Sequence, residues 1–150
     1  MFRLNLPPYP IKIQEKGEKR QIFDFLRRKW VALTPEEWVR QQTINMLHYR
    51  LCYPLELMQV EAAIALNGLT KRCDIVVYDR SVRPWMIVEC KKESVPINQK
   101  VVDQACRYNL VLQVPYLFLT NGRQQLCLEV DAAAGTLRQV PLPDFGTVKE

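Results

Sequence analysis

Two short apolar runs, RCDIVVYD and PWMIVECKK, constrain the fold of this chain more than any other feature. Both runs are rich in β-branched and aromatic residues, and only the residues RSVR separate them, which predicts a β-hairpin. Because both runs are apolar on the two faces of the strand, the hairpin should be buried between layers and not solvated on one side. The chain has 150 residues, which is enough to build one core around the hairpin.

A capping box predicts that a helix precedes the hairpin. Thr34 is placed to cap the helix, Pro35 to take its first position, and Glu37 follows the cap three residues later. This helix should run to about Cys52, and the alternating pattern of residues 55–66 favours a strand after it. Apolar residues recur at helical spacing over residues 98–113, which predicts a second helix. The segments YLFLTNG, QQLCLEVD and 137–140 are predicted to be further strands.

The order helix, three strands, helix, strand (αβββαβ) predicts an α/β fold in which helices flank a central mixed β-sheet. With 48% hydrophobic and 25% charged residues, the composition is that of one globular domain, expected over residues 1–150. Residues 1–33 should form an N-terminal extension, a proline-rich arm followed by a short strand or helical turn, and residues 141–150 a short polar tail. The basic segment LRRKW in the extension is interpreted as a solvated edge, with a phosphate-facing patch as the alternative.

Charge and cysteine usage narrow the class of protein. A formal net charge of +5 favours polyanionic partners only slightly. Five widely spaced cysteines without a CxxC pair, together with one histidine, exclude the usual zinc sites and are typical of reduced thiols in the cytoplasm. No run of about eighteen apolar residues is present, and prolines interrupt the first ten residues, so neither a membrane span nor a secretory signal is expected.

The hairpin brings charged residues together at one end. If its turn is centred on residues 81 and 82, Asp74 lies directly opposite Glu89. Opposed residues share a face of the sheet, with Cβ atoms about 4.5–5.5 Å apart. Lys91 follows Glu89 by two positions and joins this face, which the alternation also assigns to Trp85 and Ile87. Two carboxylates and one ammonium group are therefore expected at the end of an otherwise apolar surface.

This arrangement suits a divalent metal ion, because two adjacent carboxylates repel each other unless a cation lies between them. Mg²⁺ usually takes one or two protein carboxylates together with waters and substrate phosphates, which Asp74 and Glu89 fit; Mn²⁺ is an acceptable substitute. The backbone carbonyl of Cys90, between Glu89 and Lys91, is a candidate further ligand. Lys91 would orient water or balance developing negative charge. The alternative is a charge cluster at the strand ends without chemistry.

The motifs CDIVVYD and IVECKKE resemble the D…E-x-K core of the PD-(D/E)XK nuclease superfamily, which implies a restriction-endonuclease-like core. Together with TPEEWVRQQTINML, VEAAIALNG, DQACRYN and YLFLTNG, they resemble the N-terminal domain of type I restriction enzyme R subunits over roughly residues 34–122. Cys73 stands where the motif's name has proline. The sequence GxxxxGK[ST] is absent, so the ATP-driven motor of such a subunit is not expected in this chain.

The resemblance implies a role for each matching position. Asp74 and Glu89 would bind the metal, Lys91 would be the catalytic lysine, and Glu37 the acidic residue from the first helix. Gln104 and Tyr108 would match the supporting Q-x-x-x-Y element. From the residues alone, Glu37 is equally well explained by the capping box. Glu61 either reaches the site from the first predicted strand or lies buried against a basic side chain.

Two classes of function remain open. The first is an Mg²⁺-dependent DNA endonuclease or nuclease-fold module that hydrolyses phosphodiester bonds. The second is a nucleic-acid-binding or complex-forming module that keeps the fold without cleaving. The expected partners are DNA and either a second copy of the chain or subunits of a restriction or repair system. The sequence does not separate DNA from RNA and gives no cognate sequence.

Overall fold

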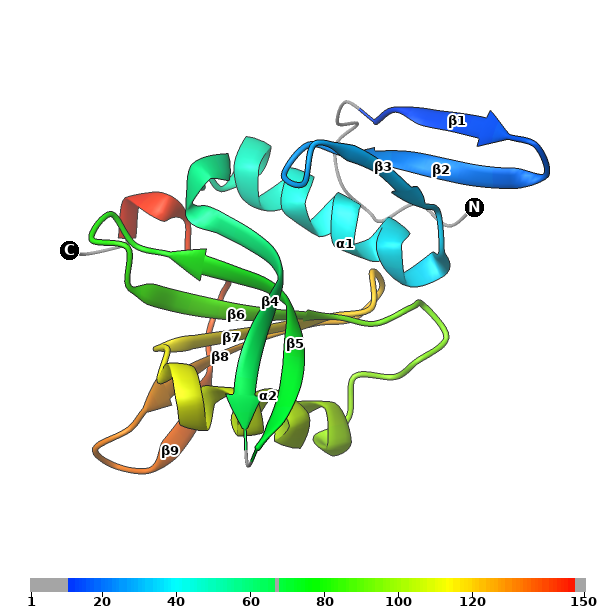
Figure 1. Ribbon diagram of the computed structural model, residues 1–150. Coiled ribbons are helices and arrows are strands. Elements are labelled where there is room, and N and C mark those ends of the chain that lie inside the picture. Colours follow the sequence, from blue (N-terminus) through cyan, green and yellow to red (C-terminus); the bar gives the residue numbers. More distant parts are fainter. Residues whose placement is uncertain (1–10, 67, 148–150) are drawn as a thin grey trace.

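The computed structural model describes residues 11–66 and 68–147 and has a mixed α/β fold (Figure 1). Over these residues it contains a small three-stranded sheet and a central six-stranded sheet. In chain order the elements are β1 (Ile13–Lys16), β2 (Lys19–Asp24), β3 (Lys29–Ala32), α1 (Pro35–Asn45), η1 (Met46–Arg50), η2 (Leu55–Leu57), β4 (Met58–Leu66), β5 (Leu69–Tyr78), β6 (Pro84–Cys90), α2 (Gln99–Leu112), β7 (Tyr116–Thr120), β8 (Gln125–Asp131), β9 (Thr136–Gln139) and η3 (Phe145–Thr147).

The central sheet is mixed, as the sequence predicts. Its strand order is β4-β5-β6-β7-β8-β9, and all neighbouring strands are antiparallel except β6 and β7. Parallel strands need a long crossover, and α2 provides it. Separate apolar clusters join the sheet to the α1 segment on one face and to α2 on the other. None of the helices in the described ranges is long and apolar enough to cross a membrane.

The local structure predicted for the N-terminal extension was wrong. Residues 13–32 form an antiparallel sheet in the order β1-β2-β3, where a single short strand or helical turn was expected. Only β2 shows a buried alternation, through Ile22 and Asp24, and the charged residues of all three strands hide this pattern in the sequence. The sheet covers α1 on the side away from the central sheet (Figure 1).

Helix α1 begins as predicted and lies between the two sheets. Oγ1 of Thr34 accepts a hydrogen bond from the amide of Glu37 at 3.0 Å, and Pro35 takes the first helical position. Helical backbone continues through η1, a π-helical turn, to Arg50, close to the predicted end at Cys52. Because protein covers both sides of α1, its polar residues are buried as well as its apolar ones: Glu37, Arg40, Gln41, Gln42, Thr43 and Asn45.

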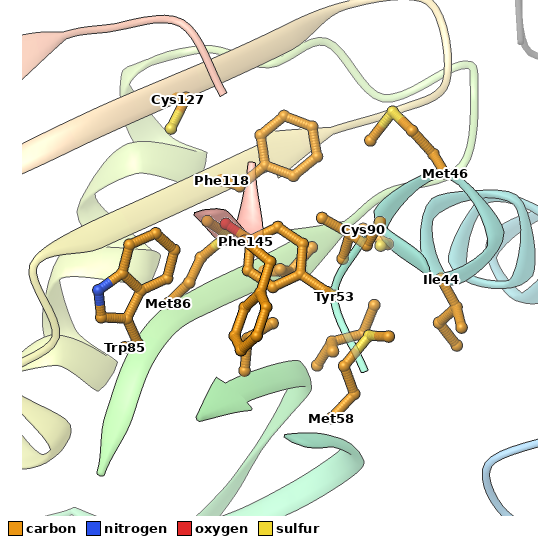
Figure 2. Close-up of a cluster of buried hydrophobic side chains, with 14 of the residues drawn as sticks. Ile44, Met46, Tyr53, Met58, Trp85, Met86, Cys90, Phe118, Cys127 and Phe145 are labelled. Atoms are coloured by element: carbon orange, nitrogen blue, oxygen red, sulfur yellow. The ribbon is translucent and has the colours of Figure 1, made fainter. Parts of the chain in front are cut away.

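Strands β5 and β6 pair in the predicted register, with Ile75 opposite Val88. Near the turn, a bulge at Tyr78 leaves Trp85 out of the ladder. The indole of Trp85 therefore packs in the core on the α1 side, with Met86, and not on the face that strict alternation predicts (Figure 2).

The predicted polar tail is partly docked into the core. Phe145 is buried, and its ring centroid lies 5.5 Å from that of Tyr53 (Figure 2). Its amide donates to the carbonyl of Leu51 at 2.8 Å, and the hydroxyl of Tyr53 donates to the carbonyl of Pro143 at 2.7 Å. The prediction was wrong for this segment because burial of one aromatic ring outweighs the polarity of its neighbours.

Candidate active site

Asp74 lies where the central sheet forks. The ladder between β5 and β6 begins at Ile75, whereas β5 pairs with β4 from Leu69 onward. At the fork the amide of Cys90 donates to Oδ2 of Asp74 at 2.8 Å, so the carboxylate takes the place of a strand partner. Oδ1 of Asp74 accepts from Arg40 at 2.8 Å. The carboxylate is thus buried and held from two sides.

Glu89 lies beside Asp74, as the hairpin register predicts, and is only 2% exposed. Desolvation raises the pKa of Glu89 to about 9, and the charge of Asp74 and a hydrogen bond with that carboxyl act in the same direction. Oε1 of Glu89 is buried without a hydrogen-bond partner among the described residues. A buried carboxylate in this state is costly, so the position favours a bound proton or cation.

Glu61 extends the row of carboxylates onto β4. It lies opposite Asp74, and its φ of +53° marks a local break in the ladder. Its carboxylate is 3.4 Å from Arg27 and 3.7 Å from both Arg40 and Arg72. Glu61 therefore reaches the cluster and pairs with basic side chains, but it is partly exposed and not buried against them.

Glu37 points into the same cluster from the first turn of α1. Its Oε1 accepts from Arg27 at 2.6 Å and from Arg40 at 2.9 Å, and its Oε2 accepts from Gln41 at 3.2 Å. The amide of Thr34 donates to a backbone carbonyl, so the Glu37 carboxylate does not close a capping box. The contacts of Glu37 therefore place its carboxylate in the charged cluster and not in a capping box.

Arg27 and Arg40 hold these carboxylates together, and neither was predicted from the sequence. Arg40 joins Glu37 to Asp74, while Arg27, in the turn after β2, pairs with Asp24 and Glu37. Burial lowers the pKa of Arg40, but the hydrogen bond and charge of Asp74 outweigh it, and the net shift is upward. The spacing of Glu37 and Arg40 was a usable signal, since residues three apart on a helix are neighbours. Arg27 belongs to LRRKW, which was interpreted as a solvated edge.

Lys91 follows β6 on the side of α2. Its Nζ donates to Oε1 of Gln104 at 3.3 Å, and its amide donates to the carbonyl of Thr120 at 2.9 Å. The positive charge of Lys91 acts to lower the pKa of Glu89, so the ammonium group is within electrostatic reach of that carboxyl. Tyr108 lies one turn after Gln104 on α2, but its side chain falls outside the described residues.

A cleft of about 480 Å³ opens beside the cluster. Arg40 links it to Asp74, since Arg40 both lines the cleft and hydrogen-bonds that carboxylate. A larger hollow of about 640 Å³ lies elsewhere, between the end of α2 and the β8–β9 hairpin. Within residues 11–66 and 68–147, no three His, Cys, Asp or Glu side chains are grouped closely enough to bind a metal by themselves. The cleft residues are Ala32, Thr34, Pro35, Glu36, Glu37, Arg40, Glu61 and Lys92.

The cysteines beside the cluster are unsuited to nucleophilic chemistry. Cys90 follows Glu89 on β6, so its side chain points to the other face of the strand, where it is fully buried. Desolvation, reinforced by the neighbouring carboxyls, raises the thiol pKa of both Cys73 and Cys90. A thiol acts as a nucleophile only as the thiolate, so carboxylates and basic groups remain as the candidates for chemistry.

Replacing Arg27 by alanine should detach the small sheet from α1. The change takes the arginine partner away from buried Asp24 and from Glu37. Leaving a buried neutral polar group without its partner typically costs about 1–3 kcal/mol of stability, and leaving a buried charge without its partner costs more. Hydrogen exchange of the β2 and β3 amides should become at least about tenfold faster. Arg28→Ala, at the exposed neighbouring position, is the control and should leave exchange unchanged. Equal protection in both variants would contradict the anchoring role.

The fold and the cluster define the class of protein: a mixed α/β domain with buried carboxylates, paired by arginines, at the fork of its central sheet. Residues 35–143 match the family described as type I restriction enzyme R protein N terminus. The chain belongs to this family, which confirms the resemblance to R subunits drawn from its motifs.

Two individual proteins illustrate the relationship. The chain is 31% identical over 93 residues to the endonuclease subunit of the type I restriction enzyme EcoAI from Escherichia coli, a match covering 61% of this chain and 11% of that protein. A solved fragment assigned to the HsdR subunit of a type I restriction enzyme from Vibrio vulnificus is similar in fold, with a TM-score of 0.56 and 21% identity. That match covers 77% of this chain and 24% of the solved chain. This chain therefore spans only a small part of the relatives it matches.

Proposed function

We propose that this chain is a nuclease domain of the PD-(D/E)XK superfamily, with a restriction-endonuclease-like core, that hydrolyses phosphodiester bonds in DNA with Mg²⁺ or Mn²⁺. Asp74 and Glu89 would be the metal-binding carboxylates and Lys91 the catalytic lysine. The observation that carries the proposal is the position of Asp74 and Glu89, which come from different strands and meet, buried, at one fork of the sheet.

The donor set at the fork fits a hard divalent cation. Two carboxylates are what Mg²⁺ usually takes from a protein, and waters or phosphate oxygens complete its coordination. The unpartnered Oε1 of Glu89 is an oxygen donor already placed in a buried position. The backbone carbonyl of Cys90 remains a proposed further ligand. When bound, the ion would supply charge neutralisation at the phosphate and acidify a water molecule.

The other groups of the cluster have tasks that follow from their contacts. Gln104 holds Lys91 by a hydrogen bond, so the ammonium group would be fixed near the site to balance negative charge on a phosphate. We assign Tyr108 a supporting role on the same helix. Glu37 would position Arg40, which in turn orients Asp74, and would act with Glu61 to set the charge of the cleft.

A non-cleaving module with the same fold is the second candidate. It is favoured by the arginine pairs, because Arg40 already neutralises Oδ1 of Asp74 and would compete with a metal ion there. DNA is the proposed substrate in the first case and the proposed ligand in the second. Because the curated relative is the endonuclease subunit of a restriction enzyme, we further propose that partner subunits of such an enzyme complete the assembly.

Plasmid cleavage separates the two candidates. Purified protein is incubated with supercoiled DNA in Mg²⁺, in Mn²⁺ and in EDTA, alongside Asp74→Asn and Lys91→Ala. If Asp74 and Lys91 act in cleavage, each variant should lower the metal-dependent rate at least about a hundredfold. The matched controls are Asp103→Asn and Lys100→Ala on the exposed side of α2, which should cleave like the wild type.

A variant that loses metal-dependent cleavage must still be folded, so each variant is checked by circular dichroism and thermal unfolding. Wild-type protein that binds DNA but leaves it intact with both metals would favour the non-cleaving module. Cleavage that survives in Asp74→Asn or in EDTA would contradict the assignment of the site.

A further inference from the structure

The outer face of the three-stranded sheet combines aromatic rings with positive charge. We propose that this face binds an unpaired DNA strand and leads it to the cleft beside Asp74; the choice of DNA rests on the proposed function. The face is called the aromatic platform and consists of Lys12, Gln14, Lys16, Lys19, Gln21, Phe23, Phe25 and Trp30.

The strand register assigns these residues to one face. Phe23 is opposite Trp30, and Gln14 is opposite Gln21, with a hydrogen bond of 2.7 Å between the two amides. Opposed residues share a face, and the alternate residues of β2, such as Ile22, turn towards α1. The aromatic platform is therefore the face of the sheet opposite to Ile22 and Asp24, and at its Phe23–Phe25 end it borders Gln41 and Asn45 of α1.

Three aromatic rings form one end of the platform. The ring of Phe23 makes edge contacts with Phe25 and Trp30, at centroid distances of 5.1 Å and 5.4 Å. The outer two remain solvent-accessible, since Phe25 is 37% and Trp30 36% exposed. Adjacent exposed rings on a sheet are the surface on which unpaired bases stack, whatever their sequence.

The charge of the platform complements a phosphate backbone. Lys16 and Lys19 are opposed at the far end, and Lys12 lies 5.8 Å from the centre of the Phe23 ring. The carboxylates of the same strands, Glu15 and Asp24, lie on the opposite face. Positive charge beside accessible rings favours a nucleic acid strand over an acidic peptide, which offers no bases to stack.

The platform is continuous with the candidate active site. Ala32 follows Trp30 by two residues on β3, so the two share a face about 7 Å apart. Ala32 also lines the cleft that Arg40 connects to Asp74. A strand stacked on Trp30 would therefore pass directly into the cleft.

Binding of a labelled dT20 oligonucleotide, measured by fluorescence anisotropy in EDTA, tests this inference without requiring cleavage. The double variant Phe25→Ala/Trp30→Ala should bind at least about tenfold more weakly than the wild type, because each stacked base contributes strongly to affinity. Tyr49→Ala removes an aromatic side chain that is 54% exposed on η1 and should bind like the wild type. Lys16→Gln/Lys19→Gln should flatten the slope of log K against log salt by about 1.4.

Tryptophan emission gives a second readout. Trp38 and Trp85 are 8% and 7% exposed, so quenching by dT20 should come from Trp30. Trp30→Phe should lose the quenching but keep its affinity within a few-fold, because phenylalanine still offers a ring. This conservative variant keeps the test valid if the double variant folds poorly.

Equal dT20 affinity in the wild type and the double variant would overturn the inference. So would equally tight binding of a blunt duplex with the same dependence on Trp30, or tighter binding of rU20 than of dT20. If no nucleic acid binds, the inference is also overturned, and a protein becomes the remaining candidate ligand for the platform. Because these measurements use EDTA, a protein that binds dT20 but never cleaves contradicts only the proposed function, and one that cleaves without using the platform contradicts only this inference.

Discussion

Replacing Arg40 by alanine should lower the free energy of unfolding by about 3–5 kcal/mol, the cost of removing one partner of a buried ion pair. Arg40 is 7% exposed and hydrogen-bonds both Glu37 and Asp74. Without it, Asp74 keeps the amide of Cys90 and the hydrogen bond with the Glu89 carboxyl, neither of which supplies a positive charge, and Glu37 keeps Arg27 and Gln41. Urea unfolding at pH 7 measures the loss, and the slope m should stay unchanged if the native fold is retained.

The matched control is Arg72→Ala. Arg72 also pairs with a carboxylate of the cluster, Glu61, but its side chain is 67% exposed. An exposed pair of this kind contributes about 0–1 kcal/mol, so the control should unfold close to the wild type. Equal small losses in both variants would show that Arg40 does not neutralise buried charge and would remove the basis for its positioning of Asp74.

The β5–β6 hairpin is the part of the fold that the sequence predicts best. Alternation and the turn position are properties of a few neighbouring residues, and they correctly predicted that Ile75 faces Val88 and that Asp74 meets Glu89. The rules failed at Trp85, where one extra residue forms a bulge. Burial of a large aromatic ring is favourable enough to shift a strand locally. A register counted from the turn assumes regular pairing and therefore does not include such a shift.

The contacts among the charged residues of the cluster were harder to predict from the sequence. Glu37 was ambiguous from sequence because a capping-box glutamate and an acidic residue of the site can occupy the same helix position. What decides between them is Arg27, supplied by a turn that is close to Glu37 only after the small sheet has folded against α1. That sheet was missed because its burial is confined largely to one face of β2. Ion pairs between distant segments leave no periodic signal, so the arginines of the site were the least predictable part.

Replacing Glu89 by glutamine should stabilise the protein at neutral and alkaline pH. Burial raises the pKa of Glu89 to about 9 from an ordinary value of 4.5. Between these values the folded protein holds a proton that the unfolded chain does not, so the free energy of unfolding falls as the pH rises, by at most about 1.4 kcal/mol per pH unit. Glutamine does not titrate, so the variant lacks this slope. Its advantage should grow between pH 5 and pH 8 towards an upper limit of roughly 4 kcal/mol.

Urea unfolding in EDTA at several pH values across this range tests the expectation, with Glu129→Gln as the control, since Glu129 is a partly exposed glutamate paired with Arg138 on the sheet surface. Parallel stability curves for Glu89→Gln and the wild type would mean that Glu89 is already ionised in the folded protein. The same substitution should lower metal-dependent cleavage at least about a hundredfold, because glutamine is a poor ligand for a divalent cation. A gain in stability joined to a loss of cleavage separates a functional carboxylate from a structural one, since removing a structural carboxylate would cost stability.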